Sequence, residues 1–172
     1  HLVIGTESSE WIIPNTVTAT NFGASLQSKH GSDTIQASFI GNACIFFAQG
    51  RKAIREYYYS SDSDTFQTNN LAVLNREILE ESAITDFDYT TNPNTRIVLV
   101  REDGQAVILL YEKTLGIQAW HRLKTNGQIK SCAITRGNDE SDLIYFVVER
   151  NGKYYLEVLG NDCYLDSYHE YI

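Results

Sequence analysis

The chain has 172 residues, of which 42% are hydrophobic and 21% charged, a composition typical of a globular protein rather than a disordered one. Its formal net charge of −8 disfavours direct binding to nucleic-acid phosphates or to anionic membranes. No apolar run approaches the roughly 20 residues of a membrane-spanning helix, and no signal peptide is indicated. Abundant Tyr, Phe, Val, Ile and Thr favour β-structure.

The cysteines and the start of the chain bear on its context. Cys44, Cys132 and Cys163 are an odd number without CxxC spacing, which indicates free thiols rather than a disulfide framework. The chain opens on a strand-like segment and contains no Met, so we expect it to be an excised piece of a longer protein.

The first predicted element is a partial unit at about residues 2–20. Apolar residues 2–4 and 11–13 flank a polar turn around Ser8 and Ser9, which predicts a hairpin. Its inner strand is expected to lie upstream or to come from another segment, because an uncovered strand edge needs a partner.

Three similar units follow, at about residues 35–68, 84–123 and 129–165. Each combines an initial strand with a hairpin that turns at a glycine. The initial strands are expected at 35–39, 84–89 and 129–134. The hairpins are expected at 44–48 with 53–57, 96–100 with 106–111, and 143–148 with 154–159. The turns are Gln49-Gly50, Asp103-Gly104 and Asn151-Gly152, of which the last two fit two-residue turns with φ > 0. The middle unit adds an outer strand at 117–122.

These units repeat with a period of roughly 40 to 50 residues, and four strands per period are typical of β-propeller blades. The sequence therefore predicts an all-β domain over residues 1–172, built from antiparallel four-stranded blade-like repeats as a partial or small β-propeller. A ring needs at least about four blades, so a closed ring and an incomplete arc both stay open.

One segment departs from the β pattern. Leu71, Leu74 and Ile78 share one face of a helix, and Asn69 or Asn70 can cap its start, which predicts a short helix at about 70–81. The polar loops at 60–64 and 137–142 are expected to be exposed.

Motifs for hydrolytic or nucleotide chemistry are missing from the sequence. Gly23-Ala24-Ser25 begins a GxSxG nucleophile elbow, but Gln27 stands where the last glycine belongs. Neither a GxxxxGK[ST] nor a GxGxxG phosphate loop occurs. Turns 101–104 and 149–152 lack the SxDxGxxW box of propeller sialidases. Carboxylates from distant strands could still meet, but no constellation is assembled, so we expect no catalytic residue and no enzyme activity.

Metal ligands are not indicated either. His1, His30, His121 and His169 are not paired with other ligand types at i+3 or i+4. Asp62-Ser63-Asp64 and the segment 137–142 resemble calcium loops in charge, but both lack the complete ligand pattern. We expect no bound metal and no cofactor.

Tyrosines gather at 57–59, at 154–155 and at positions 164, 168 and 171. Consecutive residues of a strand point to opposite faces, so one subset is expected to be buried and the other exposed. The exposed subset either lies in solvent or anchors a subunit interface.

Several phrases, taken in order, carry a resemblance to a known family. They are Leu71-Ala72-Val73-Leu74, residues 84–89 (ITDFDY), Asp103-Gly104 with Leu110-Tyr111, residues 117–122 (IQAWHR), 125–134 (TNGQIKSCAI), 142–152 (DLIYFVVERNG), Tyr155-Leu156-Glu157 and Leu165-Asp166-Ser167. Together they resemble the tail nozzle proteins (tail tubular protein B) of short-tailed phages and related prophage structural proteins. Asn75 departs from the His that the family often has there, and Tyr154 from its usual basic residue.

The resemblance implies a virion structural protein with propeller-like β domains and without catalytic residues or a cofactor. It implies a ring of subunits in the virion tail, beneath portal and adaptor proteins, that forms part of the DNA exit channel. Its partners would be other copies of itself and portal, adaptor and tail proteins, after assembly in the bacterial cytoplasm. DNA would pass without specific binding, which agrees with the acidic charge.

A second hypothesis is a β-propeller module from a host protein that binds a protein or glycan partner. Portal and tail-fibre genes beside this one would favour the tail component over the host module.

Overall fold

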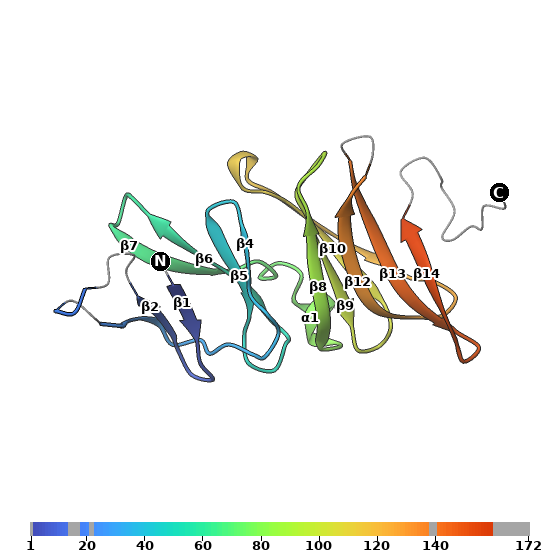
Figure 1. The fold of residues 1–172 in the computed structure, drawn as a ribbon, viewed down its shortest axis with the longest axis horizontal. Helices are drawn as coiled ribbons and strands as arrows, with labels where there is room; N and C mark the ends of the chain where they lie inside the picture. The colour runs from blue at the N-terminus through green and yellow to red at the C-terminus, as the bar shows by residue number, and fades with distance from the viewer. Residues whose placement is uncertain (1, 14–17, 21–22, 138–140, 160–172) are drawn as a thin grey trace. The chain divides into compact units, whose positions relative to one another are not determined.

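The structure is a computed structural model that describes residues 2–13, 18–20, 23–137 and 141–159. Its strands form four antiparallel sheets, accompanied by one short α-helix (Figure 1). The chain divides into two compact units, His1–Glu80 and Glu81–Ile172. The predicted all-β, antiparallel architecture with a short helix is confirmed.

The first unit contains a three-stranded and a four-stranded sheet. The three-stranded sheet has the order β1 (Leu2–Gly5), β2 (Glu10–Ile13) and β3 (Ser25–Ser28). The four-stranded sheet has the order β4 (Ser38–Ile40), β5 (Ala43–Phe47), β6 (Ile54–Ser60) and β7 (Thr65–Asn70). Each sheet is built from consecutive strands of the chain, as the repeated units predict.

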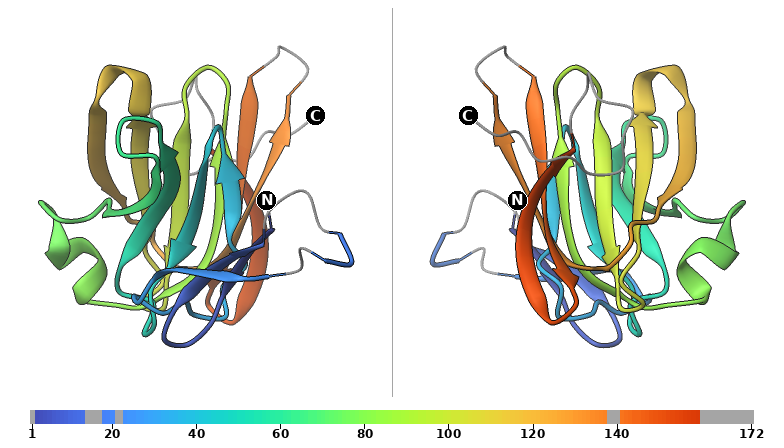
Figure 2. Two further views of the ribbon diagram at one scale, coloured as in Figure 1. Left: turned by 90° about the vertical axis from the view of Figure 1, so that its left-hand side faces the viewer. Right: turned by 90° about the vertical axis from the view of Figure 1, so that its right-hand side faces the viewer.

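The second unit has the same construction. One sheet has the order β11-β10-β9-β8, with β8 (Ile84–Thr90), β9 (Arg96–Arg101), β10 (Ala106–Glu112) and β11 (Ile117–Leu123). A short 3-10 helix, η1 (Lys113–Leu115), joins β10 to β11. The other sheet has the order β12 (Gln128–Arg136), β13 (Asp142–Arg150) and β14 (Lys153–Leu159). The strands of each sheet twist, as the side views show (Figure 2).

Several predicted boundaries are wrong. The repeat predicted at 2–20 extends beyond residue 20 to include β3, and the strand predicted at 35–39 begins only at Ser38. The repeat predicted at 35–68 runs to Asn70, because β7 is a full outer strand. β3 and β7 (SLQS and TFQTNN) consist mainly of polar residues, so apolar periodicity gives no signal for them.

The three hairpin turns differ in length. Asn151 and Gly152 both have positive φ, at 50° and 73°, which is the two-residue turn that the sequence predicts. At Asp103-Gly104 the predicted two-residue turn is wrong. Arg101 and Gln105 close a three-residue loop that ends on Gly104 at φ 80°. The Gln49-Gly50 turn is longer still, because Ala48 bonds to Ala53.

The helix is shorter than predicted. α1 covers only Arg76–Glu80, and Leu74, expected on its buried face, has 90% of its surface exposed. β7 continues through Asn70, whose side-chain Oδ1 accepts a hydrogen bond of 2.9 Å from the Ala72 N–H. This local bond holds the segment after β7 in a turn, so the helix starts later than the apolar spacing suggests.

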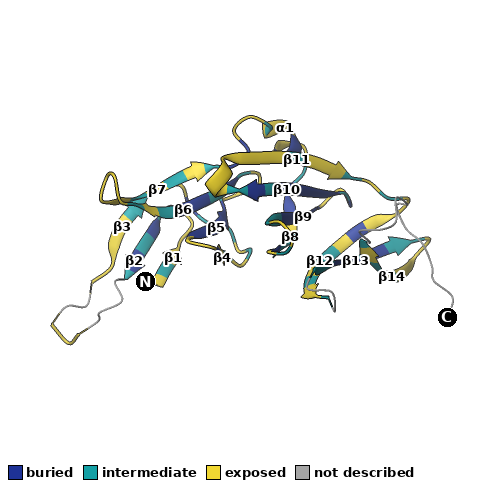
Figure 3. Ribbon diagram, turned by 90° about the horizontal axis from the view of Figure 1, so that it is seen from above, coloured by how far each residue is buried: buried dark blue, intermediate teal, exposed yellow. Residues whose placement is uncertain are grey.

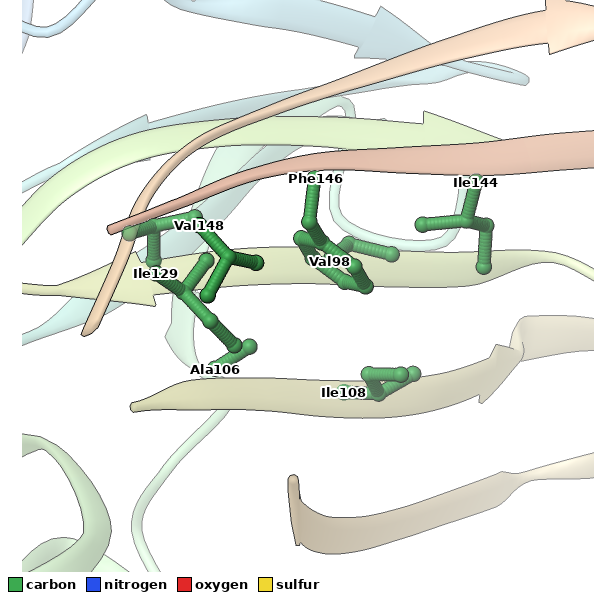
Figure 4. Close-up of a cluster of buried hydrophobic side chains, with 8 residues drawn as sticks. Val98, Ala106, Ile108, Ile129, Ile144, Phe146 and Val148 are labelled. Atoms are coloured by element: carbon green, nitrogen blue, oxygen red, sulfur yellow. The ribbon is translucent and has the colours of Figure 1, made fainter. Parts of the chain in front are cut away.

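A shared apolar core joins the two sheets of the second unit (Figure 4). β12 packs against β8 and β9. The core contains Val98, Val100, Ala106, Ile108, Ile129, Ile144, Phe146 and Val148, all less than 5% exposed. These residues alternate along their strands, so each sheet turns one apolar face toward the other.

Side-chain carboxylates add hydrogen bonds between the same two sheets. Asp86 of β8 accepts from the Cys132 N–H at 3.0 Å, and Asp88 accepts from the Ile134 N–H at 2.7 Å. Asp142, at the start of β13, accepts from the N–H groups of Thr91 and Asn92 at 2.6 and 2.9 Å. The sheets are therefore held together by polar bonds at the edge as well as by the core.

In the first unit the sheets meet around Ile12, Cys44, Phe46 and Tyr57. The segment between β3 and β4 folds close to the β1–β2 turn, where Ser32 donates its N–H to the Thr6 carbonyl at 2.7 Å. Gly31 in this segment has φ 75°, and a Cβ there would lie 2.1 Å from the Glu7 carbonyl oxygen. A side chain at this position would therefore force the two segments apart.

We predict that Phe146→Ala lowers the free energy of unfolding by about 3 to 5 kcal/mol, because it leaves a cavity in the core of the second unit. Leu156→Ala is the matched control, since Leu156 is 72% exposed in the same sheet and should lose less than about 1 kcal/mol. Urea unfolding of both variants measures this. Equal losses would contradict the packing described.

A second prediction concerns pH. The N–H groups of Asn92 and Thr91 hold the pKa of the Asp142 carboxyl below its ordinary value. Its stabilising effect is therefore complete above the pKa of an unfolded Asp, about 4, and is lost as the pH falls through the lower folded pKa. We expect Asp142→Ala to cost about 1 to 2 kcal/mol at pH 7, and the difference from the wild type to shrink below about pH 4.

The exposed Glu102 of the same unit provides the control as Glu102→Ala. Urea unfolding at several pH values should show no comparable pH-dependent difference for that variant. A cost for Asp142→Ala that is equal at pH 7 and pH 2 would contradict the role of the carboxylate.

Candidate functional site

A cavity of about 430 Å³ lies in the first unit, along β1. Its walls come from β1 and β2, from β4, β5 and β6, and from the segment 32–37. The apolar part of the lining is Leu2, Val3, Ile35, Ala37, Phe39 and Phe46. A volume of this size with mainly apolar walls is typical of ligand-binding sites.

The carboxylate of Glu10 forms one polar group of the wall. Glu10 is 1% exposed because it shares the inward face of β2 with Ile12. Its Oε2 accepts hydrogen bonds from the Ser28 hydroxyl and, at 3.3 Å, from the His30 N–H. Its Oε1 accepts one from the Ser32 hydroxyl at 3.1 Å. Three donors therefore satisfy the buried carboxylate, as burial of a charge requires.

Arg55 on β6 supplies positive charge near Glu10. Burial lowers the pKa of Arg55, and the nearby Glu10 carboxylate opposes that shift. The Arg55 Nε is buried and has no hydrogen-bond partner in the described part of the chain. Desolvation and the charge of Arg55 also lower the pKa of His30. We infer that His30 is neutral at physiological pH.

Tyr57 adds a hydroxyl without a partner. Its side chain is 2% exposed, stacks on Phe66 with ring centroids 5.0 Å apart, and lines the cavity. No hydrogen bond to its hydroxyl is found among the described residues. Burial, followed by the negative charge of Glu10, raises the pKa of the phenol. A buried, unsatisfied hydroxyl costs stability unless a ligand or water bonds to it.

The two described cysteines are poor nucleophiles. Burial raises the pKa of Cys44, which lines the cavity, to about 11, and burial also raises the pKa of Cys132. Both thiols are therefore protonated at neutral pH, whereas a nucleophilic cysteine must be a thiolate. With Tyr57 also protonated and Glu10 saturated by donors, the cavity is suited to holding a ligand by packing and hydrogen bonds.

The sequence-predicted ligand candidates do not meet. Among residues 2–13, 18–20, 23–137 and 141–159, no group of three His, Cys, Asp or Glu side chains could hold a metal ion. His30 and His121 are both exposed on different units, while His1, His169 and Cys163 lie outside the described residues. The segment 61–64 is exposed, as predicted. In the segment 137–142, Gly137, Ser141 and Asp142 are half-buried and the remainder is not described.

The tyrosine prediction is wrong for 57–59. Tyr57 and Tyr59 lie on one face of β6, since both rings contact Phe66, yet Tyr57 is 2% and Tyr59 48% exposed. Burial thus changes along the strand as well as between its faces. Tyr154, at 67% exposure, and the half-buried Tyr155 follow the expected alternation, and positions 164, 168 and 171 lie outside the described residues.

Sequence reasoning missed Glu10 and the unpaired Tyr57 hydroxyl. A signal for Glu10 exists, because it directly precedes the strand predicted at 11–13 and stands two residues before Ile12, in phase with the face of that strand to which Ile12 belongs. The missing partner of Tyr57 has no sequence signal, because it depends on which side chains surround the ring in three dimensions.

No helix in the described part of the chain is long and apolar enough to cross a membrane. A comparison with protein-family models finds no matching model, and a comparison with curated proteins finds no match.

We predict opposite effects for two changes in the cavity wall. Glu10→Ala removes a buried carboxylate that accepts three part-buried hydrogen bonds, and should cost about 2 to 4 kcal/mol of unfolding free energy. Tyr57→Phe removes a hydroxyl without a partner and should be neutral or stabilising by up to about 1 kcal/mol. Chemical unfolding of the ligand-free chain tests both. A loss above about 1 kcal/mol for Tyr57→Phe would show that its hydroxyl is bonded.

Proposed function

We propose that the chain is a nozzle-like structural component of a phage or prophage tail, a ring subunit that forms part of the DNA exit channel. The ordered phrases from residue 71 to residue 167 support this proposal by their resemblance to tail nozzle proteins. The repeated sheets support it too, because sheets that pack face to face through β12, β8 and β9 are the arrangement of propeller blades.

The observation that carries the proposal is an exposed apolar face on the sheet β12-β13-β14. Ile144, Phe146 and Val148 of β13 point into the core, so the alternate residues Tyr145 and Val147 point the other way. In the register of the sheet, Leu156 lies opposite Val147 and Val158 opposite Tyr145. Leu156 is 72% exposed, Tyr154 67% and Val158 37%. Residues along β14 are coloured as exposed or intermediate (Figure 3).

Leu156, Val158, Tyr154, Tyr145 and Val147 therefore form one surface, which we call the outer face. Contiguous exposed apolar residues of this kind mark sites of protein–protein contact. The outer face is apolar, like the opposite face of the same sheet, where Ile144, Phe146 and Val148 pack on a neighbouring sheet. We infer that a sheet of a neighbouring subunit covers it in the ring.

Charge is compatible with this role. The formal net charge is −8, and a channel for DNA must let the phosphate backbone pass without holding it. In this proposal the chain acts through contacts with its own copies and with portal, adaptor and other tail proteins.

We predict that the 172-residue chain is monomeric or weakly associated, whereas the full-length protein forms a symmetric ring. Leu156→Asp should break the ring, because it places a charge in an apolar interface. Leu115→Asp is the matched control, since Leu115 is 71% exposed in the same unit but lies in η1, away from the outer face. Light scattering and electron microscopy measure assembly.

Rings that survive Leu156→Asp would contradict the role of the outer face. A full-length monomer that neither forms rings nor binds portal or adaptor proteins would contradict the tail function and favour the host module.

A further inference from the structure

The outward backbone groups of β1 can be identified from its pairing with β2. Thr6 donates its N–H to the Ser9 carbonyl at 2.8 Å, which makes these two residues a hydrogen-bonded pair at the turn. Pairs alternate along an antiparallel ladder, so Ile4 with Trp11 is hydrogen-bonded, and Gly5 with Glu10 and Val3 with Ile12 are not. The N–H and C=O groups of Val3 and Gly5 therefore point away from β2.

No strand among the described residues pairs with that side of β1 (Figure 1). The four-stranded sheet of the same unit shows what is missing. β3 contacts β7, the outer strand of that sheet, and Val3 and Ile12 pack around Cys44 and Phe46 of β5. β1, β2 and β3 thus correspond to β5, β6 and β7, and the position that corresponds to β4 is open.

The cavity of the first unit lies along this open position. Val3 and Gly5, whose backbone groups point outward, both line it, together with Phe39 of β4 and Tyr57. Ile40 and Ala43 flank a two-residue turn and form a hydrogen-bonded pair, so the next pair, Phe39 with Cys44, is not hydrogen-bonded. The N–H of Phe39 therefore also points away from its own sheet.

The second unit shows how such a position is filled. There β8 is the first strand of its sheet and lies beside β12 of the next sheet. The Asp86 carboxylate of β8 accepts the Cys132 N–H of β12, and the Asp88 carboxylate accepts the Ile134 N–H. Ile134 pairs with Ile144 on the core side, as Phe39 pairs with Cys44 in the first unit. The N–H of Phe39 is thus the counterpart of the N–H that Asp88 binds.

We propose that a separate polypeptide strand docks antiparallel on β1 as its fourth strand, and places hydrogen-bond-accepting side chains in the cavity. Its backbone bonds to Val3 and Gly5. Alternate side chains of the strand accept hydrogen bonds from the N–H of Phe39 and from the hydroxyl of Tyr57, which has no partner among the described residues. Apolar atoms of the strand pack on Leu2 and Phe39, which are 59% and 56% exposed.

The partner is therefore an extended peptide in which acidic or other hydrogen-bond-accepting residues alternate with large apolar ones. In β-strand addition of this kind, backbone hydrogen bonds provide affinity and pockets for alternate side chains provide specificity. This inference does not depend on the tail function. A ring-forming subunit and a host module could each use the edge of β1.

The probe is a capped synthetic peptide with the sequence of residues 84–90, Ile-Thr-Asp-Phe-Asp-Tyr-Thr, titrated into the isotope-labelled 172-residue chain. We expect saturable shifts of the amide signals of Val3, Gly5 and Phe39. The control peptide carries Asp86→Lys and Asp88→Lys, which removes both acceptors while adding charge that the acidic chain attracts. It should bind at least about threefold more weakly, since each lost hydrogen bond to a charged group costs that much or more.

Val3→Pro tests the backbone bond, because it removes an outward N–H and leaves the ladder to β2 intact. Val3→Ala is the matched control, which shortens the same side chain and keeps the N–H. We expect Val3→Pro to weaken peptide binding about threefold to tenfold relative to Val3→Ala, and Tyr57→Phe to weaken it about threefold relative to the wild type.

Three results would overturn the proposal. One is the absence of saturable shifts at Val3 and Gly5, and another is equal binding of the peptide to the Val3→Pro and Val3→Ala chains. The third is concentration-dependent shifts at Val3 and Gly5 without peptide, which would assign the edge to a second copy of the chain instead of a separate strand. None of these results depends on whether the full-length protein forms a ring.

Discussion

Strands at the edge of a sheet leave every second N–H and C=O without a partner, and this chain has to satisfy them wherever one sheet packs beside another. In the second unit the side chains of Asp86 and Asp88 do so for β12, and the Gly104 carbonyl accepts the Ile129 N–H at 2.9 Å. These bonds fix the position of β12 along β8, and that position brings the apolar faces of the two sheets together. The core around Phe146 depends on it.

The same constraint explains which parts of the fold the sequence could predict. Apolar strands such as β9, β10 and β13 are buried on at least one face, so their pattern is visible in the sequence. The turn at Asn151-Gly152 is visible because both residues tolerate positive φ. Outer strands such as β7 face solvent and are held by backbone hydrogen bonds to one neighbouring strand. Because any residue type can form backbone hydrogen bonds, such strands have no distinctive sequence pattern. The helix is shorter than the apolar spacing predicts, because the Asn70 side chain accepts a hydrogen bond from the Ala72 N–H and this local bond competes with helix formation.

The candidate site was less predictable than the fold. The Glu10 carboxylate is bonded to groups of Ser28, His30 and Ser32, which are brought to it by the return of the chain between β3 and β4. Gly31 permits that return through its positive φ. A polar cluster assembled by a loop has no fixed spacing, in contrast to metal or nucleophile motifs, whose ligands recur at set intervals. The sequence could have predicted only that Glu10 is a charged residue on the inward face of β2.

The two described cysteines have a practical consequence, because each compact unit contains one of them. Cys44 is 3% exposed in the first unit, and the thiol of Cys132 in the second unit lies 3.8 Å from the Val98 carbonyl. Thiol-modifying reagents react with the exposed thiolate, so the buried Cys44 is labelled when the first unit opens, and the half-buried Cys132 is labelled faster when the second unit opens. In a chain with Cys163→Ser, labelling rates at the two positions would thus separate the opening of one unit from that of the other. Cys44 and Cys132 thus serve as native probes of the stability of the first and second unit, respectively.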